Sequence, residues 1–196
     1  MSVPRLRFTL DTSSVIHAVQ NGQYGPEIAD LVALGQAGAV HLYLTGAFEV
    51  DMERASELHL TANIAWLQNQ TAIERIPQPA RFDFSTFDDP GHGFVGDEHL
   101  EPIKKLESFM LPAELQPGQF DPAIEPDKQE KFRRKVADVQ HLAGHLMSGN
   151  DYFVTSDEDD MLRPTRKRRI FEAASIRVVD PLQALEIARR SGSVGP

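Results

Sequence analysis

The sequence predicts an α/β fold in which helices cover both faces of a central parallel sheet of four to five strands. Three observations lead to this prediction. Short apolar runs of strand length recur along the chain, stretches with helical periodicity follow them, and acidic or hydroxyl side chains stand where the apolar runs end. Strands that alternate with helices are typical of a three-layer α/β/α architecture. A length of 196 residues suits one such domain over residues 1–196.

The first strand and two helices are predicted near the N-terminus. Residues 5–10 form the strand, and Asp11 starts a turn into a helix that begins near Val15. A second helix covers residues 27–36 and ends at Gly38. The alternation that follows, over 40–44, predicts the second strand, and after it a helix extends through Met52 to Leu67.

The last third of the chain repeats this alternation. We expect a helix over about 130–147, a strand over 152–155, a linker, a strand over 176–179 and a final helix over 181–190. The repeat of strand and helix places all four predicted strands in one parallel sheet.

Residues 77–130 interrupt the pattern with eight prolines, although residues 101–110 are able to form a short helix. A connection of this length is unusual in a compact domain. We interpret it as an acidic, proline-rich insertion at the surface that acts as a lid or as an arm for a protein partner.

Composition narrows the class of protein. The absence of Cys excludes disulfides and thiolate chemistry. Neither a signal peptide nor a membrane span is expected, so we predict a cytoplasmic protein that does not bind a membrane. The net charge of −9 is uneven, because residues 81–130 carry 12 acidic against four basic side chains, a net charge of −8, which leaves −1 for the rest. The nearly neutral remainder is compatible with a nucleic-acid substrate.

Four acidic residues in separate parts of the chain carry the functional prediction. Asp11 and Asp157 each follow an apolar run, and Asp51 and Asp138 lie in predicted helices. The carboxyl ends of parallel strands meet at one crevice, which is where such sheets bind ligands. Crowded carboxylates require a cation, and oxygen ligands suit Mg²⁺ or Mn²⁺. Such ions can stabilise the attacking and the leaving oxygen when a phosphodiester is cleaved. The pattern therefore predicts a metal-dependent nuclease.

Four segments together resemble the ordered signature of PIN domains, a family of compact α/β ribonucleases that includes VapC-type toxins. The segments are FTLDTSSVIHAV, LTGAFEVDM, KVADVQHLAGHLMSG and YFVTSDEDDM followed by IRVVDPLQALE. The resemblance covers about residues 5–70 and 130–190. It implies a Mg²⁺- or Mn²⁺-dependent endoribonuclease that hydrolyses RNA, with a toxin–antitoxin role, an antitoxin or other protein as partner, and a homodimer as further expectations.

The resemblance also implies roles for individual residues. Asp11, Asp138 and Asp157 match the first, third and fourth family acids, which bind metal and serve catalysis. By its spacing from Thr45, Asp51 matches the second, where the family has Glu, and Glu49 is its rival. The resemblance further implies that Ser13 and Thr155 are supporting hydroxyls and that Asp159 is an additional acid able to hold a second ion.

A dense basic run follows the last acidic motif. It consists of Arg163, Arg166, Lys167, Arg168 and Arg169. We predict that it contacts RNA phosphates, with a solvated helix end or loop as the alternative interpretation.

Other interpretations remain open at this point. The acids could be helix caps or solvated side chains, and His141 with His145 has a spacing that can bind zinc. A catalytically silent PIN-like binding or regulatory module is the main alternative function. A haloacid-dehalogenase-type phosphatase ranks third, because that chemistry requires a second Asp where Ser13 stands.

Overall fold

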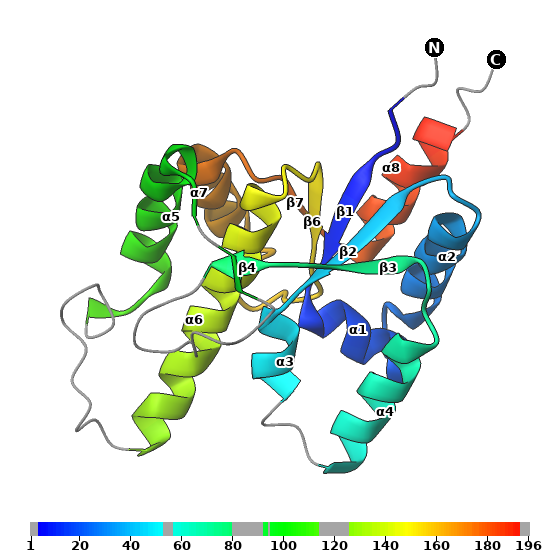
Figure 1. Ribbon diagram of the computed structural model, residues 1–196, viewed down its shortest axis with the longest axis horizontal. Coiled ribbons are helices and arrows are strands. Elements are labelled where there is room, and N and C mark those ends of the chain that lie inside the picture. The colour runs from blue at the N-terminus through cyan, green and yellow to red at the C-terminus, as the bar shows by residue number, and fades with distance from the viewer. Residues whose placement is uncertain (1–3, 53–56, 80–91, 94, 114–125, 193–196) are drawn as a thin grey trace.

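A computed structural model describes residues 4–52, 57–79, 92–93, 95–113 and 126–192. Its main sheet has five strands in the order β3-β2-β1-β6-β7, and every pairing is parallel (Figure 1). The strands are β1 (Arg7–Leu10), β2 (His41–Thr45), β3 (Ile73–Ile76), β6 (Tyr152–Val154) and β7 (Val178–Val179). The predicted α/β class with a parallel sheet is confirmed.

Helices cover both faces of this sheet. The first face carries α1 (Thr12–Val19), α2 (Gly25–Gln36) and α8 (Pro181–Gly192). The second face carries α5 (Asp97–Met110), α6 (Pro126–Met147) and α7 (Pro164–Ala174). Two further helices, α3 (Ala47–Met52) and α4 (Glu57–Gln68), lie at the carboxyl edge of the sheet, and β4 (Gln78–Pro79) pairs with β5 (His92–Gly93). The architecture is three layers, α/β/α.

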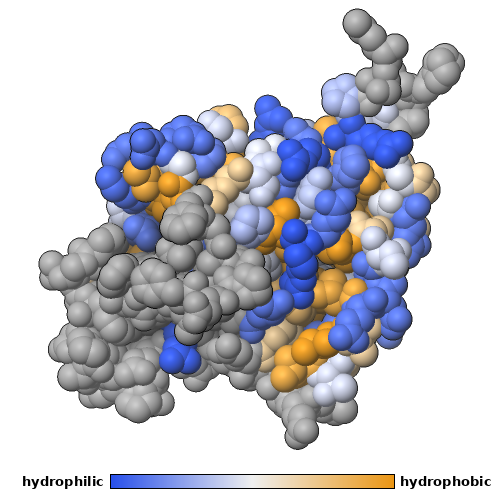
Figure 2. Space-filling view, in the orientation of Figure 1, coloured by the Kyte–Doolittle hydropathy of each residue, from blue (hydrophilic) through white to orange (hydrophobic). Residues whose placement is uncertain are grey.

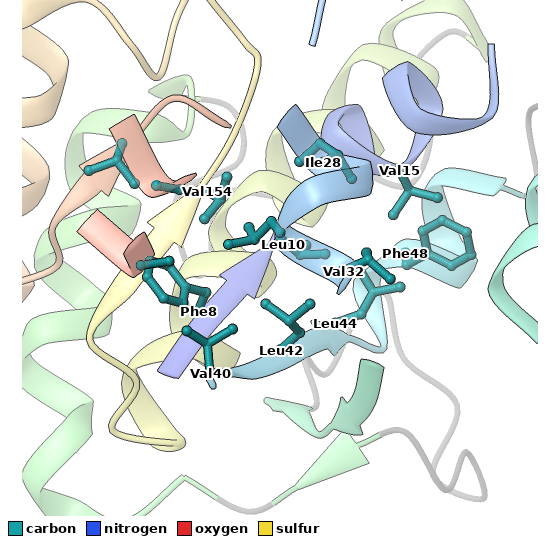
Figure 3. Close-up of a cluster of buried hydrophobic side chains, with 14 of the residues drawn as sticks. Phe8, Leu10, Val15, Ile28, Val32, Val40, Leu42, Leu44, Phe48 and Val154 are labelled. Atoms are coloured by element: carbon teal, nitrogen blue, oxygen red, sulfur yellow. The ribbon is translucent and has the colours of Figure 1, made fainter. Parts of the chain in front are cut away.

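Side-chain alternation along β1 explains how the two faces differ. Phe8 and Leu10 are fully buried against α2 in the first core, where Ile28 and Leu44 meet them (Figure 3). Thr9 points to the opposite face, and its hydroxyl shares a hydrogen bond of 2.8 Å with His145 Nδ1. One strand therefore supplies both an apolar core and a buried polar contact.

The second core lies under α5, α6 and α7. Phe153 and Leu142 are fully buried there, together with Leu106 of α5 and Ile170 of α7. Because Leu106 belongs to this core, α5 is an integral part of the domain, although it lies inside the 77–130 stretch interpreted as a surface insertion. Residues 80–91, 94 and 114–125 of that stretch lie outside the described residues.

Three elements differ from the sequence prediction. The expected linker before the last strand is wrong, because residues 164–174 form α7, which ends at Ser175 in the left-handed conformation. The single helix expected through Met52 to Leu67 is two helices, α3 and α4. The edge strand β3 was not predicted, since two charged residues occupy the centre of its four-residue sequence IERI. Within the described ranges, no helix combines the length and apolar character that crossing a lipid bilayer requires.

Candidate functional site

The candidate site lies where the strand order reverses. From β1 the chain builds outward through β2 and β3, and then crosses to β6 and β7 on the other side of β1. Ligands of open α/β sheets bind at this point, outside the carboxyl ends of the strands. A cavity of about 700 Å³ lies there, and Asp11, Asp51, Asp138 and Asp157 all line it. The four acids singled out in the sequence are therefore brought together.

Asp11 is both a helix cap and a cavity residue. Its extended backbone, with φ −81° and ψ 158°, continues β1, and its amide donates to the Val154 carbonyl at 2.8 Å. Its Oδ1 accepts from the Thr12 amide at 2.8 Å. Its Oδ2 accepts from the hydroxyls of Ser13 at 2.8 Å and Thr155 at 2.7 Å. The capping and functional interpretations of Asp11 are compatible, since one carboxylate makes all these contacts.

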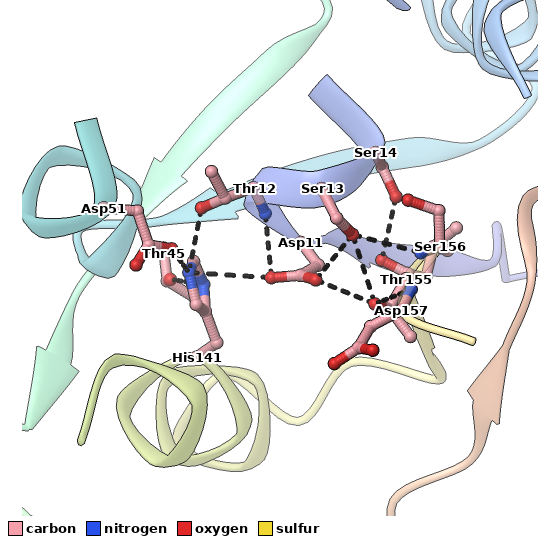
Figure 4. A network of polar contacts seen from close by, with 11 residues as sticks. Asp11, Thr12, Ser13, Ser14, Thr45, Asp51, His141, Thr155, Ser156 and Asp157 are labelled. Carbon is pink, nitrogen blue, oxygen red and sulfur yellow. Dashed lines mark hydrogen bonds and ion pairs between the residues drawn. The ribbon is translucent and has the colours of Figure 1, made fainter. Parts of the chain in front are cut away.

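The two hydroxyls connect the loops that follow β1 and β6. Ser13 Oγ lies 3.3 Å from Thr155 Oγ1 and accepts from the Ser156 amide at 3.1 Å (Figure 4). Thr155 Oγ1 accepts from the Asp157 amide at 3.1 Å. Asp157 in turn accepts from the Asp160 amide at 3.0 Å, which closes the turn after β6. Both hydroxyls thus support Asp11, while Ser13 binds the backbone amide of Ser156 and Thr155 that of Asp157.

His141 lies at the centre of the network, on α6. Its Nε2 is 3.1 Å from Asp51 Oδ2, 3.1 Å from Thr12 Oγ1 and 3.7 Å from Asp11 Oδ1, and its Nδ1 shares a hydrogen bond with Thr45 Oγ1 (Figure 4). Burial lowers the pKa of His141, but the hydrogen bond to Asp51 and the nearby carboxylates outweigh burial, so the pKa is raised.

The sequence interpretation did not include His141 in the acidic site. Its spacing from His145 suggested only a zinc site. His145, however, bonds to Thr9 of β1 and does not face the acidic cavity. Burial and Arg7 lower the pKa of His145 to about 3. The contacts of His141 join residues 90 to 129 positions apart, a relation that motif spacing cannot reveal.

Asp138 belongs to a second charged group on the same cavity wall. Lys135 Nζ donates to Asp138 at 3.1 Å and to Asp160 at 2.6 Å, and Arg166 Nε donates to Asp160 at 2.6 Å. Burial raises the pKa of Asp138 to about 7, and Asp11 and Asp51 add to the rise despite the opposing effect of Lys135. Burial also opposes ionisation of Asp160, but Lys135 and Arg166 hold its pKa below the usual range.

The rival acids occupy different places. Glu49 lines a separate hollow between α3, α4 and β3, where it pairs with Arg75 at 3.3 Å. Apolar side chains gather in this region of the surface (Figure 2), and among those that line the hollow Ile64 is exposed. Asp51 lines the acidic cavity, so it is the better second acid by position. Asp159 is exposed and also lines the acidic cavity.

The predicted basic run lies at the start of and along α7. Arg163, Arg168 and Arg169 are exposed, and Lys167 is half-buried. Arg169 lies over the Phe109 ring at 4.3 Å from its centre. Arg166 also donates to the Phe109 carbonyl at 3.1 Å, so together with its Asp160 contact it has a structural role. The exposed members are the ones available to phosphates.

Comparison of the chain with protein-family models and with curated proteins finds no match.

The donor chemistry of the cavity fits a hard divalent cation. Among the described residues, no three His, Asp or Glu side chains already converge closely enough to hold one ion. Mg²⁺, however, retains several waters and is usually held by only one or two carboxylates. Six Asp side chains line the cavity, whereas the Lys and Arg side chains in its lining are Lys135 and Arg134, so acidic groups outnumber basic ones there. An added cation would relieve that excess.

Proposed function

We propose that this protein is a Mg²⁺- or Mn²⁺-dependent endoribonuclease with a PIN-like acidic site. The observation that carries the proposal is that Asp11, Asp51, Asp138 and Asp157, from four separate segments, line one cavity at the strand-order reversal. Carboxylates at that position, with an excess of negative charge, favour phosphodiester chemistry assisted by a metal over a role for the acids as caps alone.

The acidic and hydroxyl side chains would have different roles in the proposed reaction. Asp11 and Asp51 would hold the cation, with Asp138 and Asp157 completing the negative surface around it. A bound Mg²⁺ or Mn²⁺ would lower the pKa of a water and stabilise charge on the phosphate. Ser13 and Thr155 keep Asp11 in place through hydrogen bonds of 2.8 and 2.7 Å.

In this proposal, basic side chains bind the substrate at two places, in the cavity and along α7. Lys135 and Arg134 line the cavity and would face the phosphate to be cleaved. The exposed Arg163, Arg168 and Arg169 on α7 would contact phosphates further along the strand, which supplies affinity without sequence preference.

The test is cleavage of single-stranded and structured RNAs, and of matched single-stranded DNA, in Mn²⁺, Mg²⁺ or EDTA. We expect metal-dependent RNA cleavage that falls at least about 100-fold in Asp11→Asn. Asp30→Asn is the matched control, because Asp30 is an exposed residue of α2 that pairs with Arg189 away from the cavity. This variant should retain full activity. Cleavage that persists in EDTA, or in folded Asp11→Asn, would contradict the proposal.

A catalytically silent PIN-like module is the second candidate. The contacts that favour it are those of Lys135 with Asp138 and of His141 with Asp51, which partly neutralise the acids from within the protein. Binding of Mn²⁺ or RNA without cleavage of any substrate would support this candidate. Cleavage that is lost with Asp11→Asn would exclude it.

A further inference from the structure

We propose that His141 is a positioning residue of the acidic site: it fixes the Asp51 carboxylate relative to Asp11, so that both acids are in place to bind one divalent cation. This inference rests on the proposed function, because it concerns the same cavity. It adds a residue that the PIN-like acidic signature does not contain.

The position of the ring supports this role. His141 is 0% exposed, and its Nε2 faces two carboxylates, Asp51 Oδ2 at 3.1 Å and Asp11 Oδ1 at 3.7 Å. A carboxylate only accepts hydrogen bonds, so Nε2 carries the hydrogen and donates to Asp51. The ring therefore places a donor between two groups of like charge that would otherwise repel each other.

The other side of the ring is anchored to the sheet. Nδ1 shares a hydrogen bond with the hydroxyl of Thr45, the last residue of β2, and this hydroxyl can donate or accept. The backbone of α6 approaches β2 closely at Gly144, where an added Cβ would lie 2.8 Å from the Pro77 carbonyl oxygen and 3.0 Å from Thr45 Cγ2. The imidazole is thus fixed from both sides and has little freedom to follow a moving carboxylate.

The hydrogen bonds that a buried histidine needs do not by themselves explain the two carboxylates beside His141. Thr45 at Nδ1 and Thr12 Oγ1, 3.1 Å from Nε2, already supply a partner for each ring nitrogen. His145, one turn further along α6, shows the simpler case: it is buried and bonds to Thr9. Two additional carboxylates beside Nε2 distinguish His141 from this neighbour.

Asp51 has the greater need of a fixed partner. It lies in α3, a helix of six residues that packs against α6, and its side chain is 23% exposed. Asp11, by contrast, is held by Thr12, Ser13 and Thr155. The contact with His141 therefore fixes the less constrained acid, Asp51, relative to the more constrained Asp11.

The experiment compares two amides of different reach at the same position. In His141→Gln the side-chain nitrogen can approach the place of Nε2, whereas in His141→Asn it is about one methylene shorter. We expect Mn²⁺ affinity, measured by calorimetry on the folded proteins, to fall about tenfold or more in His141→Asn, since residues that orient metal ligands typically contribute 10- to 100-fold. His141→Gln should stay within about threefold of wild type on the same basis.

Control variants separate positioning from stability. His145→Asn and His145→Gln alter the buried neighbour, so they should lower the melting temperature but leave Mn²⁺ affinity unchanged. Thr45→Val removes the anchor of the ring and keeps its volume, so it should weaken Mn²⁺ binding even if both His141 variants fail to fold. Normal Mn²⁺ affinity in Thr45→Val would then overturn the inference.

The outcomes distinguish the inference from the proposed function. If wild type binds Mn²⁺ and cleaves RNA while folded His141→Asn binds Mn²⁺ equally well, His141 is only a core residue and the inference fails alone. If wild type binds no Mn²⁺, the proposed function fails, and the positioning role fails with it.

Discussion

The charge on Asp138 should destabilise the metal-free protein. Its pKa is raised from 3.8 to about 7, so between these values the folded state binds a proton that the unfolded state has released. Folding stability from this group is complete below about pH 4 and is lost as pH rises through 7. Asp138→Asn removes the ionisable group, and in EDTA it should therefore stabilise the protein at pH 8 and have a smaller effect at pH 5.

The magnitude follows from the size of the pKa change. A rise from 3.8 to about 7 corresponds to about 4 kcal/mol at 1.4 kcal/mol per pKa unit. We take this as an upper limit, because the Asp138 side chain is 26% exposed and Lys135 lies 3.1 Å away. Allowing for solvent screening and relaxation, Asp138→Asn should raise the free energy of unfolding at pH 8 by about 1–2 kcal/mol.

Urea unfolding at pH 5 and pH 8 in EDTA measures this difference directly. Asp160→Asn is the matched control, because it removes a charge from the same cavity wall. The pKa of Asp160 is lowered, so its ionised form stabilises the fold above its unfolded pKa, and this contribution is lost as pH falls through the folded value. Asp160→Asn should destabilise the protein by about 1–3 kcal/mol at pH 8.

The comparison also has a clear refuting result. Equal destabilisation by Asp138→Asn and Asp160→Asn at pH 8 would show that the folded state does not disfavour the ionised form of Asp138. Asp138→Asn removes part of the negative surface around the cation, so it should bind Mn²⁺ more weakly than wild type. Adding Mn²⁺ should therefore narrow the stability difference between them, because a ligand at 100 times its Kd stabilises the state that binds it by about 2.7 kcal/mol.

Two further predictions concern α5 and α7. Leu106→Ala should lower the free energy of unfolding by about 2–5 kcal/mol in urea titrations, since Leu106 is fully buried in the second core; a loss below about 1 kcal/mol would mean that α5 is dispensable. Arg168→Gln combined with Arg169→Gln should weaken RNA binding and reduce the slope of log affinity against log salt by about two, and an unchanged slope would place the RNA elsewhere.

The fold class and the meeting of the acids could be predicted from the sequence because they depend on a general property of parallel sheets. Strands that run the same way bring their carboxyl ends to one edge, so Asp11 and Asp157 converge wherever the intervening chain goes. Strand length and alternation identified β1 and β2, because both are properties of the local sequence. The local sequence pattern is therefore sufficient to predict these features.

The missed features depend on contacts that local patterns do not contain. Helix α7 buries chiefly Ile170 and Ala174, so its basic sequence contains few apolar residues and was interpreted as a linker. The burial of Leu106 depends on α7, which is distant in sequence. His141 acquires its partners only when α6 packs beside the ends of β1 and β2. Each of these requires knowledge of which elements become neighbours.

Helix capping and metal binding need not compete for the same carboxylate. Asp11 Oδ2 already accepts two hydroxyl hydrogens, whereas Oδ1 accepts one amide hydrogen and faces His141 and Asp51. Because each carboxylate oxygen has about two acceptor positions, the remaining capacity of Asp11 lies on Oδ1, on the side of the second acid. The contacts that start α1 therefore also leave one oxygen directed toward the cavity, and a residue that is explained by its local turn can still carry the function.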